Sequence, residues 1–120
     1  MVVLIVANNP GLSRIWARHL ERLGNTVFVV QSQADATSYM RLNHVAVIVL
    51  DLNLDNGSAL AVADYASYRL PEARVIFVTN STFFSDGSIF NHVPNAAAML
   101  TEQTPPNDLA AIVEYHRRAS

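Results

Sequence analysis

The chain has 120 residues, a hydrophobic content of 51% and a formal net charge of −2, which fit one domain with a full core and give no sign of a nucleic-acid surface. It contains no cysteine, so disulfides, thiol catalysis and cysteine-bound metals are excluded. No apolar run reaches membrane-spanning length and the N-terminus lacks the basic start of a signal peptide, so we expect a soluble cytoplasmic protein.

The first third of the chain predicts two strand–helix units. The run Val2–Val6 is short, apolar and rich in valine, which is typical of a strand. Asn9 followed by Pro10 predicts a helix start, because asparagine caps a helix N-terminus well and proline suits the first helical position. Gly24 is expected to close this helix. A second strand over residues 27–30 and a second helix that begins at Ser32 complete the pair.

The most informative stretch is Val45–Leu50, an apolar run that Asp51 follows at once. A continuous β-branched run bounded by turn residues predicts a strand that is buried on both faces of a parallel sheet. Asp51 then lies at the carboxyl end of that strand, where sites form in open α/β sheets. The alternative is that Asp51 caps the next helix, although Gly57 and Ser58 lie closer to that helix and could cap it.

The second half of the chain continues the alternation of helix and strand. Apolar residues after Ser58 recur at helical spacing, and this third helix is expected to stop before Pro71. The expected fourth helix is weak because Gly87 interrupts it. The remaining elements are a strand over 74–79 that ends in a threonine, the fourth helix over 81–92, a strand over 96–101 and a last helix that opens at Pro105.

Five strands alternating with five helices predict an α/β fold: a flavodoxin-like, doubly wound (βα)5 three-layer sandwich. The economical order of the parallel five-stranded sheet is 2-1-3-4-5, which puts strands one and three at the centre. The carboxyl ends of these two strands meet at one edge, so Asn8 and Asp51 should lie close together. Thr79 and Glu102 should reach the same edge from the neighbouring strands.

Four segments of the sequence, taken in order, resemble the receiver domains of response regulators in two-component signalling. They are residues 3–24 (VLIVANNPGLSRIWARHLERLG), 47–60 (VIVLDLNLDNGSAL), 73–81 (ARVIFVTNS) and 96–113 (AAAMLTEQTPPNDLAAIV). The resemblance covers essentially the whole chain, so residues 1–120 are expected to form one receiver-like domain. It implies that Asp51 corresponds to the phosphorylated aspartate, the backbone carbonyl of Asn53 to a magnesium ligand, and the Thr79 hydroxyl to the group that follows the phosphoryl group on activation.

The sequence departs from the receiver pattern around this same site. Where receivers carry the acidic pair that binds magnesium, this chain has Ala7 and Asn8. Where they carry a lysine at the end of the fifth strand, it has Glu102, and all eight of its basic residues are arginine, so no shift of the alignment restores a lysine. The family's aromatic residue that reports activation corresponds to Met99, and its proline after the acceptor corresponds to Asp55.

These departures weaken the expected metal site. Magnesium prefers hard oxygen ligands and usually at least one or two carboxylates. The three positions that would hold it, Asn8, Asp51 and Asn53, offer a single carboxylate. Glu102 also puts a carboxylate where receivers have an ammonium beside the phosphoryl group. We therefore expect the Mg²⁺ site to be weak or lost, and phosphorylation of Asp51 to be slow or absent.

The sequence thus predicts a receiver-like signalling module of a two-component (phosphorelay) system that works through protein–protein contacts, and not an enzyme. The expected partner is a histidine kinase or another signalling protein. Two alternatives stay open: a conventional phosphoaccepting receiver, and a small flavodoxin-like protein that binds a cofactor. The second is disfavoured because no strand-to-helix turn forms a glycine-rich phosphate cradle.

Aromatic residues in the last third of the chain predict a contact surface. In receivers the fourth helix, the fifth strand and the last helix form the usual face for dimers or effectors. The candidates on that face here are Phe83, Phe84, Phe90 and Tyr115, with the alternative that some of them belong to the core. We expect a partner or a second copy of the chain to bind there, and neither nucleic acid nor a membrane to be bound by this domain.

Overall fold

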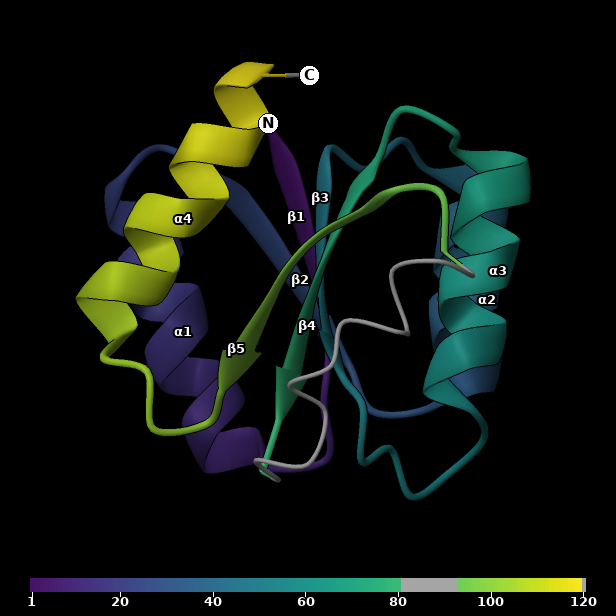
Figure 1. Ribbon diagram of the computed structural model, residues 1–120, viewed down its shortest axis with the longest axis horizontal. Coiled ribbons are helices and arrows are strands. Elements are labelled where there is room, and N and C mark those ends of the chain that lie inside the picture. The colour runs from purple at the N-terminus through teal and green to yellow at the C-terminus, as the bar shows by residue number, and fades with distance from the viewer. Residues whose placement is uncertain (81–92, 120) are drawn as a thin grey trace.

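Five parallel strands form one sheet with the order β2-β1-β3-β4-β5 in the computed structural model, which describes residues 1–80 and 93–119 (Figure 1). The strands are β1 (Val2–Val6), β2 (Thr26–Val30), β3 (Val47–Asp51), β4 (Arg74–Thr79) and β5 (Ala96–Thr101). The expected strand order is therefore confirmed. The fourth helix expected at residues 81–92, which would carry Phe83, Phe84 and Phe90, lies outside the described residues.

The described helices cover both faces of the sheet. They are α1 (Pro10–Arg22) and α4 (Pro106–Ala119) on one face, and α2 (Gln33–Leu42) and α3 (Ala59–Arg69) on the other (Figure 1). Side chains alternate between the faces along each strand, so each helical layer buries its own apolar cluster. Trp16 and Ile76 belong to the α1–α4 cluster, and Met40 and Phe77 to the α2–α3 cluster. The three layers are those of the α/β fold that the sequence predicts. None of the described helices combines the length and the apolar composition that a membrane span requires.

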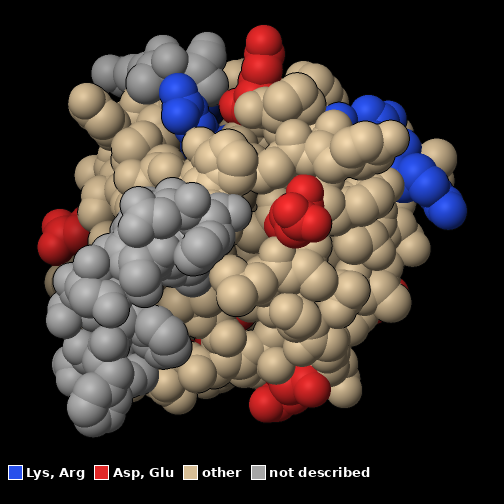
Figure 2. Space-filling model, turned by 45° about the vertical axis from the view of Figure 1, so that its right-hand side comes forward, with Lys and Arg blue, Asp and Glu red and all other residues tan. Residues whose placement is uncertain are grey.

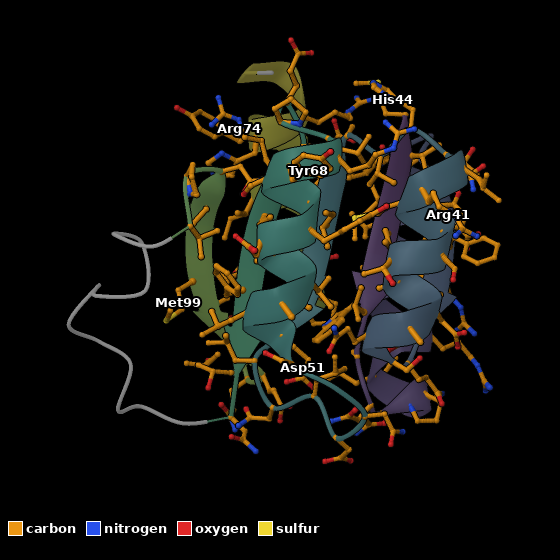
Figure 3. All side chains as sticks on the ribbon, turned by 90° about the vertical axis from the view of Figure 1, so that its right-hand side faces the viewer. Arg41, His44, Asp51, Tyr68, Arg74 and Met99 are labelled. Carbon is orange, nitrogen blue, oxygen red and sulfur yellow. The ribbon has the colours of Figure 1, made fainter. Side chains whose placement is uncertain are left out.

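β3 is buried along its whole length because it lies between β1 and β4 and under both helical layers. It begins at Val47, two residues later than the apolar run itself, and it includes Asp51 because Asp51 still pairs with Val78. Figure 3 shows Asp51 at the opposite end of the molecule from Arg74, which is the first residue of β4. Asp51 therefore lies at the carboxyl edge of the sheet, as expected.

The side chains predicted to begin the helices do so. Asn9 and Ser32 are the N-caps of α1 and α2. Ser58 Oγ accepts a hydrogen bond (3.2 Å) from the backbone N–H three residues further on and caps α3, so the alternative assignment of Asp51 as that cap is wrong. Gly24 follows α1 with φ of 91°, a left-handed conformation that glycine adopts without steric penalty.

Candidate functional site

Asp51 is a nearly buried carboxylate at the end of the central strand. Its exposed fraction is 5%, and its Oδ1 accepts a hydrogen bond (2.8 Å) from the backbone N–H of Asn53. This bond folds the chain back at the end of β3 and fixes the orientation of the carboxylate. Asp51 therefore has a set geometry at the sheet edge, where a ligand or a reacting group could reach it.

Asn8 comes from the end of β1, on the other side of the switch point, and binds the loop after β3. Its Nδ2 donates to the backbone carbonyl of Asn53 at 2.5 Å, and its Oδ1 accepts from the backbone N–H of Asp55 at 3.0 Å. We call this pair of hydrogen bonds the Asn8 clasp. It confirms that Asn8 and the segment after Asp51 converge, and it engages both polar atoms of the Asn8 side chain.

Asn53 extends the same network to β4. Its side-chain Oδ1 accepts a hydrogen bond from the backbone N–H of Asn80 (3.2 Å) and lies 3.5 Å from the hydroxyl of Thr79. Thr79 is 2% exposed and is the last residue of β4. The carboxyl ends of β1, β3 and β4 are thus joined through one asparagine. The sequence indicated a role for the Asn53 carbonyl and missed the role of its side chain.

The loop after β3 is also attached to the start of α2. The backbone N–H of Gln33 donates to the carbonyl of Asn56 (2.9 Å), and its side-chain Oε1 accepts from the backbone N–H of Ser58 (2.8 Å). Gly57, between these two contacts, has φ of 109°. Gly57 is a turn signal that the sequence shows. Sequence reasoning missed Gln33, because a polar residue in the first turn of a helix does not identify a distant partner.

Met99 on β5 and Glu102 just after it lie on the far side of β4 from Asp51. The backbone N–H of Glu102 donates to the carbonyl of Thr79 at 3.0 Å, so the chain places this half-buried acidic residue beside the end of β4. Met99 pairs with Phe77 and packs, half-buried, against the α2–α3 cluster. Met99 therefore lies on β5 and Glu102 directly follows it, beside the site, as the resemblance implies.

Tyr115 lies elsewhere, on α4. It is 70% exposed and lines an open groove of about 740 Å³ between α1 and α4, together with His19 and Leu23. Its ring also makes an edge contact with His116. Tyr115 is available to a partner, although the described contacts place it at the groove next to α1.

The oxygen atoms near Asp51 do not suit magnesium well. Of the three positions that would hold the ion, Asp51 supplies a carboxylate, the Asn53 carbonyl already accepts from Asn8, and the Asn8 oxygen already accepts from Asp55. Among the described residues, no group of three or more His, Asp or Glu side chains gathers where it could hold a metal ion. The residues present fit poorly the metal that the resemblance implies, because they bring a single carboxylate, the low end of what magnesium usually takes, and the other two oxygens already accept hydrogen bonds.

The sequence matches no protein-family model, and it matches no curated protein. Its structure does match solved structures. One is the N-terminal domain of a three-domain response regulator/sensory box/GGDEF protein from Carboxydothermus hydrogenoformans, with a TM-score of 0.87 and 21% identity over 99% of this chain and 95% of that chain.

Two further matches are response regulators that were solved with ligands or modification. One from Burkholderia pseudomallei has a phosphorylated aspartic acid and a calcium ion, with a TM-score of 0.84 and 20% identity over 98% of this chain and 69% of that chain. One from Thermotoga maritima is a complex with Mg²⁺-BeF, with a TM-score of 0.82 and 16% identity over 96% of this chain and 97% of that chain. Identities this low establish the fold alone. The chain has the fold of response-regulator receiver domains, and the resemblance that its sequence indicates is confirmed at that level.

Proposed function

We propose that this chain is a cytoplasmic, receiver-like signalling domain of a two-component system that works through protein contacts, with weak or absent magnesium-dependent phosphorylation at Asp51. The receiver fold over 99% of the chain supports the signalling class. The partner in this proposal is a histidine kinase or another signalling protein. The proposed role of this chain is to bind that partner, and it does not include turnover of a substrate.

The Asn8 clasp is the observation that carries this proposal. A carbonyl that helps to hold magnesium in receivers here accepts an N–H from Asn8 at 2.5 Å. That N–H supplies the positive partial charge that the oxygen would otherwise take from a cation. A magnesium ion would compete with this amide for the carbonyl oxygen, and it would find one carboxylate, that of Asp51, among the three positions.

The surface supports contact with protein more than with nucleic acid. On the face that Figure 2 shows, basic side chains of the described residues lie in separate groups and form no continuous band. A nucleic-acid surface needs clustered positive charge to neutralise phosphates. Exposed Tyr115 offers the kind of aromatic anchor that protein interfaces use.

A magnesium titration followed by NMR of the backbone amides tests this proposal. We expect the amides of Asp51 and Asn53 to show no saturable change up to about 10 mM Mg²⁺, a concentration at which weak divalent-cation sites in proteins are filled. The double substitution Ala7→Asp with Asn8→Asp should create saturable binding at these amides, because it supplies two carboxylates and removes the clasp.

A matched control distinguishes specific Mg²⁺ binding near Asp51 from a general effect of two added negative charges. Ala34→Asp with Ser38→Asp adds the same two charges on the exposed surface of α2. This control should leave the amides of Asp51 and Asn53 insensitive to Mg²⁺. Saturable binding by the unmodified protein at these two amides would instead favour the conventional receiver.

A further inference from the structure

The outer edge of β2 lacks the features that usually protect the edge of a sheet. β2 pairs only with β1 in the described sheet. Its sequence, Thr-Val-Phe-Val-Val, contains no charge and no proline, and it has no register shift against β1. The opposite edge strand, β5, does have such an irregularity, between its partners Val75 and Ile76. An uncharged and regular edge strand is a template for pairing with another strand.

The hydrogen-bond pattern shows which backbone groups of β2 face outward. Thr26 donates its N–H to the carbonyl of the first residue (2.9 Å), and Val30 accepts from the N–H just after β1 (3.1 Å). In a parallel pair, alternate residues turn both backbone groups toward the partner strand. Val27 and Val29 therefore turn their N–H and C=O groups away from β1, toward the open edge.

Apolar side chains flank this edge on the α2 side. Phe28 is 47% exposed and stacks on Tyr39 of α2, with ring centroids 4.4 Å apart. Leu42, at the end of α2, is 76% exposed. These residues line an open groove of about 600 Å³ between β2 and α2, in which the charged side chain among the described lining residues is Asp35. The patch joins unused backbone hydrogen-bonding groups to exposed apolar surface.

We propose that β2 pairs with β2 of a second copy of this chain, antiparallel, about a two-fold axis that passes beside Phe28. In this register Val27 of each copy faces Val29 of the other, so all four outward N–H groups of these valines find carbonyl acceptors. Phe28 lies opposite Phe28 of the second copy in a non-hydrogen-bonded pair, the kind in which the side chains come closest. The two sheets become one continuous sheet.

The edge suits a second copy because it is complementary to itself, as an interface with two-fold symmetry requires. Valine lies on both sides of Phe28, so the rotation matches like residues and brings no charge against a charge along the strand. Tyr39 stacks on Phe28 and so lies near the axis, and Asp35 lies one helical turn away from Tyr39 along α2. The rotation therefore puts the two copies of Asp35 on opposite sides of the axis. This surface is separate from Asp51 and from the Tyr115 groove, and the inference stands whether or not Asp51 is phosphorylated.

Cysteine cross-linking tests the register directly, since the chain has no cysteine of its own. Phe28→Cys would place two thiols opposite each other across the axis. Thr26→Cys is the matched control, at another exposed position of the same strand face. In this register the two copies of residue 26 are offset by four residues along the strand, or roughly 13 Å at about 3.3 Å per residue, which is too far for a disulfide. Under the same mild oxidant, we expect Phe28→Cys to form a covalent dimer at least about tenfold faster than Thr26→Cys. Equal rates, or a faster reaction of Thr26→Cys, would overturn the proposal.

Amide exchange in the unmodified protein tests the same pairing without a substitution. Exchange of the Val27 and Val29 amides should slow as the protein concentration rises, because pairing covers them. The Thr26 amide is already bonded to the carbonyl of Met1, so its exchange should not depend on concentration. A protein that sediments as a monomer at every concentration, with unchanged exchange at Val27 and Val29, would overturn the proposal, including the case in which the edge binds only a segment of another protein.

Discussion

At position 8, an asparagine can do something that an aspartate cannot. A carboxylate only accepts hydrogen bonds, so an aspartate there would face the Asn53 carbonyl with oxygen against oxygen, and a cation would have to lie between them. The amide of Asn8 donates to that carbonyl and accepts from Asp55 at the same time. The exchange of one oxygen for one nitrogen thus lets the polypeptide hold the loop after β3 by itself.

Gly57 is the residue at which this loop is most sensitive to a side chain. Its φ is 109°, and a Cβ at this position would overlap the Cβ of Gln33, the nearest atom, and would also lie only 2.7 Å from Gln33 Oε1. We predict that Gly57→Ala lowers the free energy of unfolding by about 1–3 kcal/mol from the backbone conformation and by about 1–3 kcal/mol more from the overlap. Urea unfolding, followed by fluorescence of the single, buried Trp16, measures this loss.

Gly24 provides the matched control. Its φ of 91° is similar, but a Cβ there would meet no atom within 4 Å. Gly24→Ala should therefore lose only the conformational part of the stability. A loss for Gly57→Ala no larger than that for Gly24→Ala would show that the contact with Gln33 yields easily and that the loop is not firmly attached to α2.

At the scale of elements, the strands and the helix starts were predictable because their signals are local. Val47–Leu50 is apolar because β3 is covered on both faces, and Asn9 and Ser58 cap the helices that follow them. Strand–helix alternation predicted parallel strands with right-handed crossovers, and the order 2-1-3-4-5 was the economical choice for a doubly wound chain of this size. The bounds shifted by one or two residues because the ladder, and not hydropathy, decides where pairing ends: Asp51 is polar and still belongs to β3.

The polar network of the site was predictable only in part. Placing Asn8 near Asp51 required nothing more than the strand order. The partners of the Asn8, Asn53 and Gln33 side chains are loop backbone groups, and their choice depends on loop geometry that leaves no periodic pattern in the sequence. The predicted strand order already put the second strand at an edge of the sheet. The exposure of Phe28 and Leu42 beside that edge was missed, because exposure there depends on how α2 packs and leaves no pattern in a short apolar strand.

The last helix carries a pH-sensitive group at the end of the molecule away from Asp51. Burial of the ring, and then the nearby positive charge of Arg74, lower the pKa of His116 below its usual 6.5. The unfolded chain therefore binds this proton more readily than the folded chain does. This difference lowers the free energy of unfolding at low pH. The loss is absent well above pH 6.5 and grows as the pH falls from 6.5 through the folded-state pKa.

We predict that Arg74→Gln raises the pKa of His116 but leaves it below 6.5, because burial, the larger cause, remains. NMR titration of the His116 ring measures this. Arg69→Gln, which removes an exposed arginine on α3, serves as the control and should leave the titration unchanged. A midpoint of at least 6.5 in the unmodified protein, or no response to Arg74→Gln, would contradict this account of the charge at the α4 end.

At the scale of the whole molecule, the described surfaces with a candidate role are made of different residues. Asp51 and the Asn8 clasp lie at the carboxyl edge of the sheet, at the opposite end from Arg74 (Figure 3). The β2 edge runs along one side of the sheet, and Tyr115 lies at the groove between α1 and α4. A protein built in this way can hold more than one contact at a time. The central question is whether the carboxyl edge accepts a phosphoryl group at all.

Incubation of the unmodified protein with Mg²⁺ and acetyl phosphate, followed by measurement of the intact mass, answers that question most directly. We predict little or no gain of a phosphoryl group, since the site offers one carboxylate near the metal position and has Glu102 in place of a lysine. The triple variant Ala7→Asp, Asn8→Asp, Glu102→Lys should gain the group, and Glu102→Lys alone should gain less because the metal would still lack its carboxylates. Rapid and nearly complete phosphorylation of the unmodified protein, abolished by Asp51→Asn, would contradict the account and identify a working phosphoacceptor.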